Sequence, residues 1–522
     1  MFATAKTRWA RALRASAVVV VSATALALAA CTGGGGSDTT STTLTIAATA
    51  GPTTLDPTLS VNGVPGVWFP NLAYEALIER APDGTAQPGL ATDWAYSDDR
   101  LSFVLNLRDG VKFSDGTPMT ADDVANWLKH YKEKGSIGAW LANVSDIEAT
   151  GPLQVTLTLS TPDPMLPYAL DQGGMAGDVV GPAGLKDLDA LGTTTNGAGP
   201  YMIDADATIQ NSQYVYVKNP HYYNKDKQKW EKIVIKIISD GNAILSALKT
   251  GQVQVAEGAA TDADAAKSAG LDVVSAPSAM LGMYIGDIDG KIVPALKDVR
   301  VRQALNYAID REGIASSLYG EYGKPTAQFV PEGVGGYLAE LEDRYPYDPD
   351  KARELLAEAG YPDGFEFTLV EQPAVSSGDL LAQAMVDNWK DIGVNVTLKP
   401  TDSFATYVPL MGTQEYPATT LTFQYSVQLT DTQQLVTNPA LYNYMGYTDE
   451  KANQLATDQR KFDIDSPEGV KAAEASETYM VENAFLVPVV STQALLFAGK
   501  GVKGLDFTTY PWPDPSNWVP AK

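Results

Sequence analysis

The chain repeats the order strand, helix, strand in two places, and this repetition restricts its fold class. In residues 233–255, isoleucines alternate with polar residues, and a helical pattern and a short strand follow. The same order recurs in residues 365–398. Helices that follow strands in this way pack on the faces of a sheet, so we predict an α/β protein with two sheets. The predicted strands are 233–237, 253–255, 365–369 and 394–398, and the predicted helices lie near 243–249 and 379–391.

Several helix starts carry capping residues. Thr120 and Asp123 have the spacing of a capping box before an apolar helical face. Asp348 precedes a proline at the first helical position, and Gly360 follows at the expected end of that helix. Ser466 opens a late helix in the same way. Residues 485–497 then form an apolar segment that we predict as the closing strands.

The length of the chain requires more than one core. At 522 residues and roughly 150 residues per domain, it is long enough for about three domains. Its 44% hydrophobic and 19% charged content is typical of a folded soluble protein. No period of 20–50 residues is present, which excludes a repeat architecture.

The N-terminus has the layout of a secretory signal. Four basic residues precede an apolar run over residues 15–28, which is too short for a membrane span. The sequence Leu-Ala-Ala-Cys that ends at Cys31 resembles the bacterial lipoprotein cleavage box. Cys31 is the only cysteine, so it has no disulfide partner, and lipidation accounts for it. We predict a signal peptide at 1–30, and a lipidated cysteine with a flexible Gly/Ser/Thr tether at 31–43.

The formal net charge of -25 excludes one class of partner. So acidic a chain repels the phosphates of nucleic acids and of anionic lipids. We therefore expect no nucleic-acid partner, and contact with the membrane only through the lipid anchor on its extracytoplasmic face.

Four stretches resemble the family 5 extracellular solute-binding proteins, the group that contains oligopeptide-, dipeptide- and nickel-binding receptors. The first runs from Gly89 to Tyr131 and includes RDGVKFSDGTPMTADDV. The second, 197–255, contains GAGPY and NPHYY, and the third contains DVRVRQALNYAID at 298–310. The fourth joins YDPDKARELLAEAGYPDGF at 347–365 to WKDIGVNVTLKP. These motifs are rich in turn residues and one-sided apolar positions, so we interpret them as scaffold and not as ligand contacts.

The resemblance implies a periplasmic-binding-protein-like fold, with two hinged α/β lobes and an additional third domain. It also implies a monomeric receptor of an ABC importer, without cofactor, metal or catalytic residue, that encloses a small-molecule solute and delivers it to a membrane permease. The expected boundaries are 44–74, 191–276 and 491–522 for the first lobe, 75–190 for the additional domain and 277–490 for the second lobe.

The resemblance also places the solute between the lobes. It implies first-lobe contacts from Val64 and Trp68, in the loop after the first strand. The second-lobe candidates follow the expected crossover or lie on aromatic segments of that lobe: Met280, Tyr284, Phe404, Tyr407, Phe423, Gln424 and Tyr425.

Residues 422–431 depart from the family pattern. Peptide-binding relatives carry an aspartate here that pairs with the peptide ammonium, whereas this chain has Ser426 and neutral neighbours. Asp431 can take the place of that aspartate only if this loop bends differently from the loop of the relatives. A buried ammonium without a carboxylate is unfavourable, which argues against free-N-terminus peptides. Peptide or peptide-like solutes remain the leading class, with oligosaccharides as the alternative.

Two other functions receive little support from the residues. A nickel site would require ligands, but neither His130 nor His221 has a visible partner in the sequence. A secreted hydrolase of the penicillin-recognising type needs S-x-x-K and K-T-G on separate elements. Here both patterns share Lys249, so the match is accidental.

Overall fold

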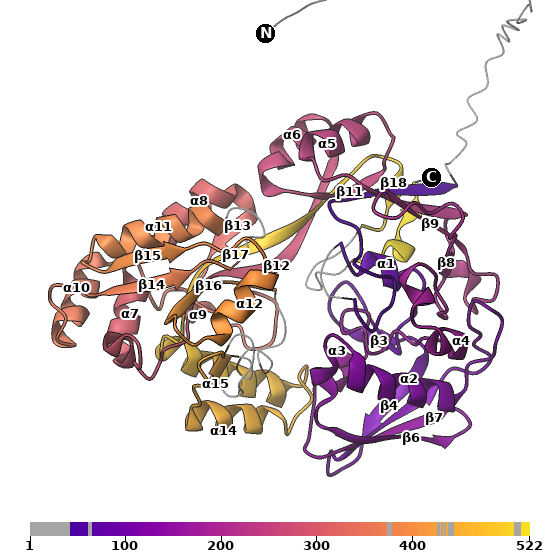
Figure 1. Cartoon of the computed structure of the whole chain (residues 1–522), viewed down its shortest axis with the longest axis horizontal. Coiled ribbons are helices and arrows are strands. Elements are labelled where there is room, and N and C mark those ends of the chain that lie inside the picture. The colour runs from indigo at the N-terminus through magenta and orange to yellow at the C-terminus, as the bar shows by residue number, and fades with distance from the viewer. Residues whose placement is uncertain are drawn as a thin grey trace, which may run out of the picture. The chain divides into compact units, whose positions relative to one another are not determined.

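A computed structural model of the chain describes residues 42–60, 65–372, 378–424, 443–505 and 513–521, together with Leu429, Thr432, Leu435 and Val436. Among these residues, eleven strands form one mixed sheet in the order β15-β14-β16-β12-β17-β11-β1-β10-β9-β8, with β13 paired to β17. Figure 1 shows the arrangement.

One half of this sheet contains the first predicted β-α-β unit. Strand β1 (Thr43–Ala48) is parallel to both β10 (Lys232–Ile237) and β11 (Val255–Gly258). The predicted helix is confirmed as α5 (Gly241–Lys249), whereas the strand expected at 253–255 begins at Val255. The remaining elements of this half are β8 (Tyr201–Ile203), β9 (Gln213–Lys218) and α6 (Ala263–Ser268).

The other half contains the second unit. Strand β14 (Glu366–Val370) is parallel to β15 (Asn395–Lys399) and to β16 (Ala418–Gln424), and α11 (Gly378–Lys390) connects β14 to β15. The helices and short strand of this half are α7 (Val299–Tyr307), α8 (Arg311–Tyr319), β13 (Gly323–Pro325), α9 (Ala339–Glu342), α10 (Pro349–Glu358), α12 (Phe404–Gly412), α14 (Glu450–Gln459) and α15 (Pro467–Glu482).

A separate antiparallel sheet lies on the segment that carries the first family-like motif. Its order is β4-β5-β7-β6, and α2 (Ala121–Lys134) packs against β6 and β7. The strands are β4 (Ala91–Tyr96), β5 (Ser102–Leu107), β6 (Val144–Gly151) and β7 (Gln154–Leu159). Smaller elements are α1 (Trp68–Asn71), β2 (Ile78–Arg80), β3 (Ala86–Pro88), α3 (Leu166–Ala169), α4 (Pro182–Lys186), β18 (Val502–Lys503) and β19 (Val519–Pro520).

The predicted helix caps are confirmed. Thr120 and Asp123 form a reciprocal capping box at the start of α2. Asp348 accepts a hydrogen bond from the Lys351 amide at the start of α10, and Ser466 accepts one from Gly469 at the start of α15. Gly360, just after α10, has a φ of 91°, which a residue with a Cβ rarely adopts.

Two long strands connect the halves of the large sheet. β12 (Asp272–Ile285) pairs antiparallel with β17 (Leu486–Ala498) along almost its whole length (Figure 1). One apolar core contains Ala276 and Leu496, and another contains Ala279 and Val490. The chain therefore passes from one core to the other twice, within adjacent segments of these two strands. The apolar C-terminal segment, predicted as several strands, is the single strand β17.

Candidate functional site

The parallel strands of the two halves point their carboxyl ends toward each other. Strand β11 runs antiparallel to β17 and ends where Gly258 is opposite Leu495. Strand β16 runs antiparallel to β12 and ends where Gln424 is opposite Ala279, which is itself opposite Thr492. Leu495 and Thr492 are three residues apart, or about 10 Å along the strand. Because ligands of open α/β sheets bind beyond the carboxyl ends of the strands, this junction is the candidate site.

One face of the sheet carries polar side chains at this junction. Residues directly opposite each other in a ladder share a face, and alternate residues of a strand share a face. Glu257 is opposite Leu496, and Gln424 is in line with Thr492. Since Thr492 and Leu496 are four residues apart on β17, Glu257 and Gln424 lie on the same face. Glu257 and Thr492 are half-buried, and Gln424 is exposed.

Thr49 and Glu257 join the ends of the neighbouring strands β1 and β11. The Thr49 hydroxyl donates a hydrogen bond of 2.5 Å to Oε2 of Glu257. Burial raises the pKa of the Glu257 carboxyl above its usual range, and the Thr49 hydrogen bonds only partly offset this effect. Within the described residues, Glu257 forms no ion pair with a lysine or arginine. The junction thus presents a partly dehydrated carboxylate without a cation.

Five of the predicted contact residues have side chains packed inside the cores: Trp68, Met280, Tyr284, Tyr407 and Phe423. Trp68 is fully buried, with its ring edge-on to Trp518 at a centroid distance of 5.9 Å. The buried Tyr284 donates a hydrogen bond of 2.7 Å to the Leu435 carbonyl. The Tyr407 hydroxyl lies 3.2 Å from Oγ1 of Thr419. Met280 is also fully buried. In this conformation these side chains stabilise the lobes, and their contact with a solute stays a prediction.

Strand alternation separates Phe423 from Gln424. Phe423 is opposite Met280 in the β12–β16 ladder, and it packs against Phe329 at a centroid distance of 5.0 Å. Gln424 follows directly and projects from the other face, which is the face of Glu257. Of the predicted contact residues whose side chains the structure describes, Gln424 is the one at the polar junction.

The other predicted residues lie outside what the structure describes. Val64, Tyr425, Asp431 and Cys31 are outside the described residues, and Phe404 is described only as the first residue of α12.

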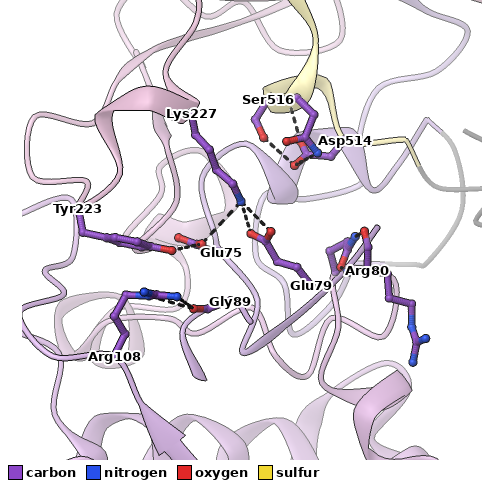
Figure 2. Close-up of polar contacts among 11 residues, drawn as sticks. Glu75, Glu79, Arg80, Gly89, Arg108, Tyr223, Lys227, Asp514 and Ser516 are labelled. Carbon is purple, nitrogen blue, oxygen red and sulfur yellow. Dashed lines mark hydrogen bonds and ion pairs between the residues drawn. The ribbon is translucent and has the colours of Figure 1, made fainter. Parts of the chain in front are cut away.

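Residues of the first two family-like motifs form a polar cluster with Glu75 and Glu79 (Figure 2). Glu75 accepts a hydrogen bond of 2.6 Å from the Tyr223 hydroxyl, and Lys227 forms an ion pair with Glu79. Arg108 donates to the Gly89 carbonyl at 3.0 and 3.2 Å, with its guanidinium 4.8 Å from the centre of the Tyr223 ring. Arg108 and Tyr223 come from different motifs, and here they hold together distant parts of the fold.

A separate hollow of about 670 Å³ lies away from the polar junction. It is lined by residues within 94–100, by Pro164 and two residues of α3, and by residues within 461–465, between α14 and α15. Polar contacts bridge these segments: Arg100 to Asp463 at 2.8 Å and Tyr168 to Asp465 at 3.1 Å. These contacts connect the small antiparallel sheet and α3 to the segment between α14 and α15, which belongs to the other half of the molecule.

The described residues contain neither a metal-ligating cluster nor a membrane-spanning helix. No group of three or more His, Cys, Asp or Glu side chains there is arranged to hold a metal ion. None of the helices in that part of the chain combines the length and apolar character that a membrane crossing requires.

The family of the chain is identified by comparison with known families. The model of the bacterial extracellular solute-binding proteins, family 5 (middle region), matches residues 85–454. The chain belongs to this family. Family 5 proteins are solute receptors that deliver small solutes to ABC permeases, so the chain is the substrate-binding component of an ABC transporter.

Known proteins resemble the chain in sequence and in fold. The glutathione-binding protein GsiB of Salmonella paratyphi A is 29% identical over 369 residues, which cover 69% of each chain. HbpA2 from Haemophilus parasuis superposes with a TM-score of 0.78 at 22% identity, over 92% of this chain and all of its own. AgaA from A. tumefaciens R10, in complex with agropinic acid, has a TM-score of 0.75 and 26% identity, over 92% of this chain and 99% of its own. The predicted fold, with two hinged α/β lobes, is confirmed.

Thr49 and Glu257 are not among the predicted contacts. Both residues carry a signal in the sequence, since each is the first polar residue after the apolar end of a strand: Ile46–Ala48 for Thr49 and Val255–Ala256 for Glu257. What the sequence did not show is that β1 and β11 are neighbours, with their ends at the crossing strands.

Proposed function

We propose that this family 5 receptor captures peptides or peptide-like solutes between its two lobes and is anchored by a lipid at Cys31. The receptor class follows from the family match over residues 85–454. The proposed domain boundaries are those expected from the sequence. The crossover expected at 276–277 is supported by the two apolar cores, one of which contains Ala276 and the other Ala279.

The solute class is supported by the curated relatives and by the junction. GsiB is named for glutathione, a tripeptide with amide groups and a free ammonium. Gln424 offers an amide that donates to and accepts from a peptide group, and Glu257 offers a carboxylate on the same face. A site with these groups suits an amide-containing solute that carries a positive charge.

Binding of the solute closes the hinge in this proposal. The two lobes are connected by the crossing strands, and hinge closure around a ligand is the usual motion of such receptors. The closed form docks on a membrane permease. Cys31 keeps the protein at the extracytoplasmic face of the membrane, and Cys31→Ser is expected to release it into the medium.

A thermal-shift screen of the purified protein tests the solute class. The panel contains di- to hexapeptides, glutathione, N-acetylated peptides and oligosaccharides. A ligand at 100 times its Kd stabilises the folded state by about 2.7 kcal/mol, which raises the melting temperature measurably. A rise with peptides or glutathione is the expected result. A rise with oligosaccharides alone would replace the peptide proposal by the alternative of a sugar receptor.

A further inference from the structure

The crossing strands bring a carboxylate, which has no ion-pair partner among the described residues, to the place where the solute binds in the proposed function. Glu257 lies at the carboxyl end of β11, one residue before the strand ends, and its face of the sheet continues through Thr492 to Gln424. In Figure 1 this region lies where β12 and β17 continue from β11 toward β16.

The position of Glu257 is energetically unfavourable for an isolated carboxylate. The side chain is half-buried, and burial raises the pKa of its carboxyl. Its partner among the described residues is the neutral hydroxyl of Thr49. Asp240, in the connection between β10 and α5, is by contrast engaged as the cap of α5, where it accepts from the Ala243 amide. A partly dehydrated carboxylate without a cation is stabilised by any positive group that enters the site.

We propose that Glu257, held by Thr49, is the specificity residue that binds a positively charged nitrogen of the solute. This inference rests on the proposed function and adds a requirement to it: the solute carries an ammonium or a similar cation. The first lobe then supplies the carboxylate that the sequence lacks at 423–428 of the second lobe.

Glu257 and Gln424, on the two sides of the junction, contact different parts of the solute in this proposal. The Glu257 carboxylate has acceptor positions left beside the one that Thr49 occupies, so it can accept one or two hydrogen bonds from an ammonium. Gln424 lies on the same face but on the other lobe's strand, so its amide faces a different part of the solute. A solute that touches both groups connects the two lobes, which favours the closed form.

Isothermal calorimetry with matched probes tests this inference. The probes are trialanine and glutathione, each with a free amine and with the amine acetylated. The wild-type protein is expected to prefer the free amines by 10-fold or more, because hydrogen bonds between charged groups are strong. In Glu257→Gln, which keeps the shape and removes the charge, the preference is expected to fall to about twofold or less.

Three further variants separate recognition from structure. Thr49→Val keeps the carboxylate, so the amine preference should persist. Glu148→Gln makes the same chemical change at an exposed position on β6 and should leave binding unchanged. Glu257→Asp keeps the charge but withdraws it by one methylene group, so it should keep the preference while binding more weakly. The melting temperature of each unliganded variant shows whether it is folded.

Each outcome decides between the inference and the proposed function. An amine preference that survives in folded Glu257→Gln overturns the role of Glu257 and leaves the peptide receptor intact. Equal binding of free and acetylated probes to the wild-type protein overturns the requirement for a cation, again without loss of the receptor function. Binding of oligosaccharides and of none of these probes overturns both proposals.

Discussion

Glu75 keeps its carboxyl group in a buried position beside a second carboxylate. Burial, and then the charge of Glu79, raise the pKa of Glu75 to about 8, although Lys227 and the Tyr223 hydroxyl act in the opposite direction. The group therefore holds a proton in the folded protein at pH values where an unfolded chain has lost it. At the residue scale, this carboxyl couples the scaffold cluster in Figure 2 to pH.

The stability that depends on Glu75 should fall as the pH rises. A carboxyl with a raised pKa binds its proton more tightly in the folded state, so its contribution is complete below the unfolded pKa of about 4.5 and is lost as the pH approaches 8. In Glu75→Gln the decline of the melting temperature between pH 5 and pH 8 should be smaller than in the wild type. The control is Glu148→Gln, which should keep the wild-type profile, and identical profiles for all three proteins would contradict the assignment.

At the element scale, the close pairing of β12 and β17 depends on Gly282. A Cβ built on Gly282 would lie 2.1 Å from the carbonyl oxygen of Val487, a contact that requires the backbone to move. The register of the two strands shifts between Leu281 and Gly282, so the ladder is already irregular at this point. Glycine is required here because two main chains approach each other, not because of an unusual φ.

Gly282→Ala should therefore destabilise the protein. Forcing an extra methyl group into packed structure typically costs about 1–3 kcal/mol, and chemical denaturation measures the change. Gly412→Ala is the matched control: a Cβ on Gly412, at the end of α12, meets nothing within 4 Å. That variant should be neutral or slightly more stable, since alanine favours a helix over glycine. Equal stability of the two variants would contradict the close approach at Gly282.

At the scale of the whole molecule, contacts far from the crossing strands join the regions of the two cores. Arg100 pairs with Asp463, and Tyr168 donates a hydrogen bond to Asp465. Met165, Leu429 and Ala456 form a small apolar cluster beside them. A hinge that opens at β12 and β17 separates the segments that make these contacts, so they favour the closed conformation.

The double variant Arg100→Gln, Tyr168→Phe should weaken solute binding without altering the site. Exposed pairs contribute about 0.2–1 kcal/mol, so the Kd should rise about two- to fivefold, as measured by calorimetry. X-ray scattering should show a more open average form. Lys218→Gln removes the Lys218–Glu231 pair, which joins the end of β9 to the residue before β10 in one lobe, and should change neither quantity. An unchanged Kd in the double variant would show that these contacts do not bias closure.

Much of the local structure was predictable because its causes are close in sequence. Thr120 and Asp123, which form the capping box, are three residues apart in sequence. Asp348 and Ser466 likewise accept hydrogen bonds from amides three residues later. The apolar positions Ala304, Leu305, Ala308 and Ile309 share one helical face by their spacing, and all four are fully buried. The family-like motifs extend this reasoning to the fold, since turn residues and apolar spacing are what the motifs preserve.

The α/β class, most strands and helices, and the receptor family that the comparison confirmed could be predicted from the sequence. Which distant residues meet depends instead on the tertiary structure. Trp68 packs on Trp518, and the Tyr284 hydroxyl reaches the Leu435 carbonyl, across 450 and 151 residues of chain. Glu257 and Gln424 share a face because β11, β17, β12 and β16 pair in that order. Periodicity specifies which side of its own strand a residue occupies, but pairing between distant strands depends on the packing of whole lobes, which no local pattern encodes.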